Sequence, residues 1–186
     1  MAKEILQRDA PVLREIAKEV PVETITSSKI KTVLKEMREA LDSQDDGVAI
    51  AAPQIGYNLR IFVVSGKVEK IMKEAKMGIA EEDIVPEEDK NIPPHMIFIN
   101  PVITKISKKK SSVEEGCLSV RYLYGKVSRG VKATVTAFDE DGKKFTRGGS
   151  GLLAQIFQHE VDHLNGILFI DKAKYLEEMP PDHLKK

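Results

Sequence analysis

Residues 158–166 of this chain, QHEVDHLNG, constrain its fold and chemistry more than any other stretch. His159 and His163 are four positions apart, so on a helix they lie one turn apart on the same face and can share a metal ion. Glu160 follows the first histidine, where its carboxylate can reach a metal-bound water without becoming a ligand. The pattern predicts a helix that carries a hydrolytic metal centre.

The neighbouring residues favour a helix that packs on the core. Ser150 is placed to cap its start, and Gly166 is placed to end it. Histidines on a core-facing helix need partners, and a shared metal supplies one. The alternative is two surface histidines beside an incidental glutamate. The apolar stripe that supports the helix consists of Leu152, Leu153, Ile156, Phe157 and Val161.

A tetrahedral catalytic centre needs a third protein ligand, and the source of that ligand separates two classes of hydrolase. In metalloproteases with a third histidine in the motif, that position would be Phe169, which cannot bind metal. A lone cysteine is more often a buried small hydrophobe, but beside two histidines the thiolate of Cys117 is a strong ligand. A zinc peptidase would instead need a downstream ligand. The downstream candidates are Asp171, Glu177, Glu178, Asp182 and His183.

A third class of protein would use these residues without catalysis. The metal would then stabilise a binding protein, for example one that grips protein N-termini. A closed structural site normally has four protein ligands and needs no base. This chain offers three ligands and the additional carboxylate of Glu160, which favours an enzyme.

Three motifs in a fixed order make the chain resemble the peptide deformylases. They are GVAIAAPQ at 47–54, EGCLS at 115–119 and QHEVDHL at 158–164, and the similarity spans roughly residues 5–171. The resemblance implies an enzyme that removes the N-formyl group from the initiator methionine of nascent polypeptides and releases formate. It also implies that Cys117, His159 and His163 bind one divalent metal ion. Fe²⁺ is the expected metal in the cell, and Zn²⁺, Ni²⁺ or Co²⁺ are able to occupy the site.

The same resemblance assigns roles to other residues. Glu160 would take the proton of the attacking water, and the oxyanion would be held by the metal, the side chain of Gln54 and the backbone N–H of Leu118. The peptide would bind along the first two motifs, with its first side chain in an apolar pocket. The expected substrate-binding residues are Gly47, Val48, Ala49, Val113, Glu115, Gly116, Leu152, Gln155 and Ile156.

Three residues depart from the pattern of the family. Ala49 stands where a glycine is usual, so its methyl group either crowds the peptide groove or is harmless, depending on its φ angle. Gln155 stands where an aliphatic residue is usual, and its amide either faces the pocket or turns to solvent. Arg121 stands where many members have proline.

The remaining patterns predict an α+β fold in which short antiparallel sheets wrap around the motif helix. A helix is expected from Ser27 or Ser28 to about Asp42, and the charged insert 67–91 is expected to be helical over 67–76. Residues 1–171 would form one catalytic domain, and the tail 172–186 would contain a short helical segment and then fray. The expected strands are 59–64, 95–100, 102–104, 127–131, 132–138 and 143–147, with a hairpin turn at 139–142.

Composition excludes several other classes of protein. The chain has 186 residues, a length that suits one domain, and its 29 basic and 29 acidic side chains give no global field that would attract DNA. No apolar run is long enough to span a membrane, and a single cysteine cannot form an internal disulfide. We therefore expect a cytoplasmic protein. Transient contact with the ribosome would have to be local, and the basic run 105–110 is more typical of a solvated turn.

Overall fold

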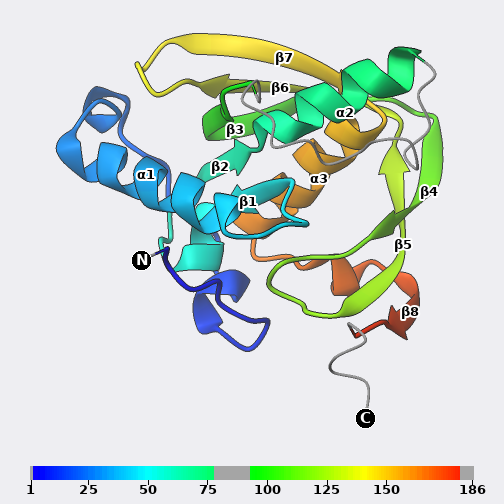
Figure 1. Ribbon diagram of the computed structural model, residues 1–186. Helices are drawn as coiled ribbons and strands as arrows, with labels where there is room; N and C mark the ends of the chain where they lie inside the picture. The colour runs from blue at the N-terminus through cyan, green and yellow to red at the C-terminus, as the bar shows by residue number, and fades with distance from the viewer. Residues whose placement is uncertain (1, 78–92, 181–186) are drawn as a thin grey trace.

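In the computed structural model, residues 2–77 and 93–180 are described, and they form two antiparallel sheets around a central helix (Figure 1). One sheet contains β1 (Ala49–Ala51), β2 (Ile61–Val64), β3 (Met96–Ile106), β6 (Lys132–Phe138) and β7 (Lys144–Ser150) in the order β1-β2-β3-β6-β7. The other contains β4 (Lys110–Glu115), β5 (Leu123–Gly130) and β8 (Lys174–Glu178) in the order β4-β5-β8. The expected α+β class is confirmed.

Three α-helices accompany the sheets in the described part of the chain: α1 (Ser28–Asp42), α2 (Gly66–Met77) and α3 (Leu152–Leu164). Short 3₁₀ helices span Pro11–Arg14, Val22–Thr24, Ala52–Ile55 and Phe169–Asp171. Helix α3, which carries the histidine motif, contacts every strand of the five-stranded sheet and also β5. Within the described residues, no helix has the length and apolarity that crossing a membrane requires.

Strands β1 and β2 of the five-stranded sheet are buried on both faces. Along β2, Ile61 and Val63 belong to the apolar cluster that includes α1, whereas Phe62 and Val64 belong to the cluster that includes α3. This alternation follows from the two-residue period of a strand. Helix α1 begins as expected, because the Ser27 side chain accepts a hydrogen bond from the backbone N–H of Ile30.

An aromatic cluster fixes α3 on the sheet. The rings of Phe62 and Phe98 stack with centroids 4.5 Å apart, and Phe157 of α3 meets Phe98 edge-on at 5.2 Å. All three side chains are buried. Gln158 adds a polar contact, because its amide bonds to both the N–H and the carbonyl of Gly130 at the end of β5. The helix is therefore held by both sheets.

Some of the expected secondary structure is wrong in detail. Ser150 ends β7 and does not cap α3, which follows Gly151 without a side-chain cap. The tail forms β8 where a short helix was expected, because its backbone pairs with β5. The helical first half of the insert is confirmed by α2, and the acidic second half, 78–92, lies outside the described residues.

Gly166 provides a test of how the end of α3 packs on the N-terminal segment. Its φ is +72°, and a Cβ there would lie 2.7 Å from the carbonyl oxygen of Arg14. Gly142 has a similar φ of +77° but nothing within 4 Å of its Cβ position. Either alanine substitution should lower the free energy of unfolding by about 1–2 kcal/mol because of the left-handed backbone. Gly166→Ala should lose roughly 1–3 kcal/mol more through the clash.

Urea denaturation of the two variants measures this difference. Equal losses in Gly166→Ala and Gly142→Ala would show that the contact with Arg14 relaxes without cost.

Candidate active site

Helix α3 and the segment after β4 bring three metal-binding side chains together. The Sγ atom of Cys117 lies 3.2 Å from Nε2 of His163, and the ligand atoms of Cys117, His159 and His163 all lie within 4.8 Å of one another. A metal bonded to a thiolate at about 2.3 Å and to imidazoles at about 2.0–2.1 Å would separate its ligand atoms by roughly 3.3–3.6 Å. The three residues therefore fit a divalent metal ion, which would leave a fourth position free of protein ligands.

Glu115 determines which nitrogen of His159 is free. Its carboxylate oxygen lies 3.0 Å from Nδ1 of the imidazole. An ionised carboxylate only accepts hydrogen bonds, so Nδ1 carries the proton and Nε2 remains available to a metal. A carboxylate in this position also fixes the orientation of the ring.

A buried ion cluster holds Glu115 in turn. The Arg129 guanidinium donates two hydrogen bonds to Glu115, at 2.6 and 2.8 Å, and one to Asp162 at 2.6 Å. Burial alone would raise the pKa of Glu115, but the bonds from Arg129 and His159 outweigh it and lower that pKa from 4.5 to about 2. Lys172 completes the cluster with a 2.6 Å bond to Asp162. Glu115 is therefore ionised at neutral pH.

The two histidines differ in their preferred charge. Burial lowers the pKa of both, but hydrogen bonds to Cys117 and Glu115 bring the pKa of His159 well above its usual value. The pKa of His163 lies well below its usual value because of burial and the neighbouring His159 charge. His159 is therefore protonated more readily than His163.

Glu160 follows His159 on α3, and one of its carboxyl oxygens accepts no hydrogen bond from the described residues. The residue is 4% exposed, and its Oε2 has no hydrogen-bond partner among the described residues. Burial raises its pKa from 4.5 to about 7. A carboxyl group with such a pKa can both accept and release a proton near neutral pH.

The side-chain amide of Gln54 is oriented by the backbone. Its Oε1 accepts a 2.8 Å hydrogen bond from the N–H of Ala51, which can only donate. Its Nε2 must therefore point the other way, where it donates to Ser119 Oγ at 3.1 Å and lies 3.7 Å from Cys117 Sγ. No partner for the backbone N–H of Leu118 is found in the described part of the chain. The Gln54 amide therefore points toward Cys117, where it can stabilise negative charge.

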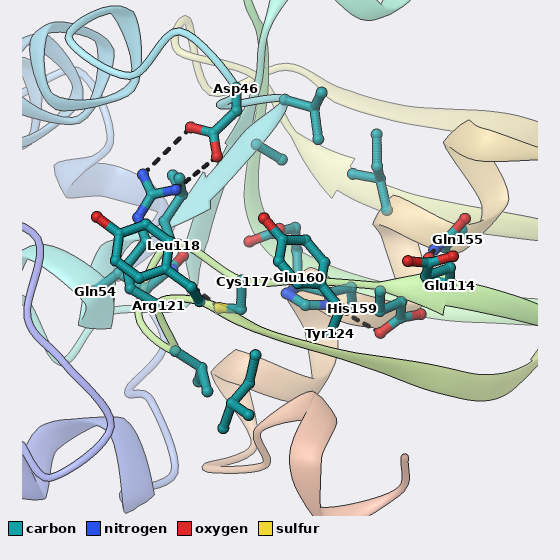
Figure 2. Close-up of a pocket in the computed structure, with 18 of the residues that line it drawn as sticks. Asp46, Gln54, Glu114, Cys117, Leu118, Arg121, Tyr124, Gln155, His159 and Glu160 are labelled. Atoms are coloured by element: carbon teal, nitrogen blue, oxygen red, sulfur yellow. Dashed lines mark hydrogen bonds and ion pairs between the residues drawn. The ribbon is translucent and has the colours of Figure 1, made fainter. Parts of the chain in front are cut away.

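These residues surround a cavity of about 290 Å³ (Figure 2). The cavity lies between β1 and β4, which are edge strands of the two sheets, and α3 forms its floor. His163 does not line the cavity, because it is buried in the core and only 1% exposed. The expected site residues that line the cavity are Val48, Ala49, Gln54, Glu115, Gly116, Cys117, Leu118, Leu152, Gln155, Ile156, His159 and Glu160.

Two expected substrate-binding residues do not line the cavity. Gly47 packs against the end of α1, where a Cβ would lie 3.0 Å from the Leu41 side chain. Val113 pairs with Val127 on β5. The cavity lining along β4 begins at the next residue, Glu114. The glycine at position 47 therefore leaves space for the Leu41 side chain behind the groove.

Sequence reasoning missed most of the wall that follows Cys117. Tyr124 covers Gly116, because a Cβ on that glycine would lie 2.7 Å from the tyrosine ring. Of these residues, the sequence marked only Arg121 as unusual, because proline is common at that position in the family. The additional lining residues are Asp46, Glu114, Val120, Arg121, Tyr122, Leu123 and Tyr124.

The structure answers the questions raised by Ala49 and Gln155. Ala49 lies in β1, its φ is not in the left-handed region, and its side chain is 7% exposed within the cluster that includes α3. Alanine is therefore accommodated without backbone strain. Gln155 lines the cavity, and its amide nitrogen donates a 2.8 Å hydrogen bond to the carbonyl of Glu114.

Comparisons with known proteins agree with this geometry. The family model of polypeptide deformylase matches residues 2–179. Peptide deformylase 2 of Clostridium acetobutylicum is 37% identical over 91% of this chain and 93% of its own length. Peptide deformylase 1A of Arabidopsis thaliana chloroplasts and mitochondria is 38% identical over 91% of this chain, which spans only 60% of that protein. A Met-Ala-Ser-bound peptide deformylase structure from Acinetobacter baumannii is 28% identical, with a TM-score of 0.74 over 92% of this chain and 99% of its own.

The contact between Glu115 and His159 can be tested through metal affinity. Glu115→Gln keeps the shape of the side chain but removes the charge that orients the imidazole, so we expect Zn²⁺ affinity to fall about 10–100-fold. Arg129 retains Asp162 as a partner, which should allow the variant to fold. Competition with a chromophoric chelator measures the affinity.

Glu114→Gln is the matched control, because Glu114 is the exposed neighbour on the same strand. A loss of affinity that is equal in the two variants would mean that Glu115 acts only through the general charge of this region.

Proposed function

Because the chain belongs to the polypeptide deformylase family, we propose that it removes the formyl group from the N-terminal methionine of nascent polypeptides and releases formate. One observation carries the assignment. Cys117, His159 and His163 converge on one point at the edge of the cavity, and Glu160 lies beside them with a free carboxyl oxygen. This arrangement has three metal ligands, an open position and a base, which is the composition of a catalytic metal site.

The donor set favours a transition metal with affinity for sulfur. Thiolate and imidazole ligands suit Fe²⁺, Zn²⁺, Ni²⁺ and Co²⁺, and we propose Fe²⁺ as the ion that the enzyme uses in the cell. When bound, such an ion supplies a water of lowered pKa and polarises a carbonyl oxygen. A reducing cytoplasm is the proposed setting, since Cys117 must remain reduced in order to bind the metal.

The residues of the chain perform the remaining steps. Glu160 removes a proton from the attacking water and later returns it to the departing amine. The Nε2 group of Gln54, held in place through Ala51, and the N–H of Leu118 donate hydrogen bonds to the oxygen that becomes negative at the formyl carbon. Arg129 acts through Glu115 to hold His159 in position.

The cavity suits an extended peptide with an apolar first side chain. Because β1 is an edge strand beside the cavity, an extended peptide can pair with it. Val48, Leu152 and Ile156 form an apolar wall for the methionine side chain, and the Gln155 amide is already bonded to the backbone of β4. The peptide deformylase structure from Acinetobacter baumannii contains Met-Ala-Ser. This supports a product that begins with a free N-terminal methionine.

Two further assignments belong to the same proposal. Residues 1–171 would form the catalytic domain, with 172–186 as a tail that adds β8 to the smaller sheet. Transient contact with the ribosome would use the exposed lysines where β3 ends and β4 begins, at 105 and 108–110. Co-sedimentation with ribosomes at increasing salt tests this contact, and salt-independent binding would argue against it.

Metal content separates this proposal from a zinc peptidase with a downstream ligand. Cys117→Ser should reduce bound metal at least ~10-fold, because a serine hydroxyl is a poor ligand for these metals. The rival candidate Asp171 already accepts hydrogen bonds from Arg14 and from the N–H of Leu168. Asp171→Asn should therefore keep its metal, as measured by elemental analysis of anaerobically purified protein. The opposite pattern would favour the peptidase.

Formate release tests the activity itself. The protein, purified anaerobically, should release formate from formyl-Met-Ala-Ser, with iron content measured on the same sample. Glu160→Gln preserves all three proposed ligands, so metal should stay bound while turnover falls at least ~10²-fold. Near-normal turnover in this variant would rule out the proposed base.

A further inference from the structure

Arg121 and Asp46 form an ion pair across the wall of the cavity. The guanidinium donates two hydrogen bonds to the Asp46 carboxylate, at 2.6 and 3.2 Å, and a third to Gln44 at 2.8 Å. Asp46 precedes β1, and Arg121 follows the Cys117 segment, so the pair joins the two sides of the peptide groove. Hydrogen bonding to Asp46 raises the pKa of Arg121, as expected for a pair of opposite charges.

The pair lies at one end of the site. Figure 2 shows Asp46 and Arg121 on one side of Cys117 and Glu160, with Gln155 and Glu114 on the opposite side. The pocket assigned to the first side chain is formed by α3 near Gln155. The formyl end of the peptide is assigned to Gln54, which follows β1, so a peptide that pairs with β1 runs toward the start of that strand, where Asp46 and its partner Arg121 lie.

The geometry of an extended peptide determines which substrate side chain would sense this pair. Successive side chains of a strand point to opposite faces and rise about 3.3 Å per residue. If the first side chain enters the pocket, the second points to solvent and the third returns to the protein surface. The third residue of the substrate is therefore the one that faces Asp46 and Arg121.

The charges of the pair are unequally exposed. The Asp46 side chain is 58% exposed and that of Arg121 is 25% exposed, so an unpaired Asp46 would present a negative charge to the substrate. The other carboxylates nearby are balanced or lie apart from this end. Glu115 is paired with Arg129, and Glu114 lies at the opposite end of the cavity, beside Gln155 (Figure 2).

We propose that the Arg121–Asp46 ion pair is a specificity-determining element that keeps this end of the peptide groove neutral. The pair allows the enzyme to accept substrates with acidic or basic third residues at similar rates, an indifference that suits an enzyme acting on many nascent chains. The two-point bond to Asp46 needs the planar fork of arginine. The inference rests on the proposed function, because it assigns the direction of a formylated peptide.

Matched peptides test the inference. The readout is the ratio of kcat/KM for formyl-Met-Ala-Lys-amide to that for formyl-Met-Ala-Glu-amide, which should lie within about twofold of one in the unmodified enzyme. Arg121→Gln exposes the charge of Asp46 and should raise the ratio at least ~5-fold. Asp46→Asn exposes the charge of Arg121 and should lower it by a similar factor. The double variant should return the ratio to its original value.

Three controls make the result specific. Arg121→Lys preserves the charge and should leave the ratio within about twofold. Arg38→Gln removes another 2.6 Å ion pair, that with Glu140, which does not line the cavity, and should not change the ratio. The shifts should also shrink in 1 M salt, where charges are screened beyond about 3 Å.

The outcomes distinguish this inference from the proposed function. Absence of formate release from formyl-Met-Ala-Ser by the unmodified enzyme would refute the function. Normal release with an unchanged Lys-to-Glu ratio in both single variants would overturn the role of the ion pair alone. A ratio that fails to return in the double variant would also overturn it, because the effect would then not arise from charge.

Discussion

The buried guanidinium of Arg129 is the interaction on which the catalytic geometry depends. It extends from β5 to Glu115 at the end of β4 and to Asp162 of α3, and it is 5% exposed. These are the two segments that carry the proposed metal ligands, since Cys117 follows Glu115 by two residues and Asp162 lies between the histidines. A buried charge left without its partner is strongly destabilising. The relative position of β4 and α3 is therefore set by charge pairing as well as by apolar packing.

Apolar packing and hydrogen bonding to the backbone complete the same positioning. The ring of Phe157 fixes α3 on the five-stranded sheet through Phe98, and the Gln158 amide bonds to both backbone groups of Gly130. Gln158 thus couples the helix to the residue that follows Arg129 in the chain. The result is a rigid floor between two edge strands, β1 and β4. Support of this kind would keep the proposed ligands and the proposed base in place before substrate binds.

The sequence predicted the parts of the site that depend on local spacing. His159, Glu160 and His163 lie on one helix, so their proximity follows from the helical period. Cys117 and Gln54 lie on distant segments. Ligand chemistry suggested Cys117 as a partner of the histidines, and only the order of three motifs connected Gln54 with them. The sequence marked Arg121 as unusual but did not place it or Tyr124 at the cavity, because the segment between Cys117 and β5 has no periodic pattern. Strand β8 was missed for a similar reason, since its conformation depends on pairing with β5.

Ala49 and Gln155 show why departures from the family pattern are hard to interpret from sequence. The cost of a polar Gln155 in an apolar pocket depends on whether its amide finds a partner, and the carbonyl of Glu114 on another strand supplies one. The effect of Ala49 depends on φ and on the space beside β1, and both are set by the packing of α3. In each case the deciding contact comes from a distant segment of the chain. The chemistry of the residue alone therefore leaves its effect on the groove undetermined until the fold is known.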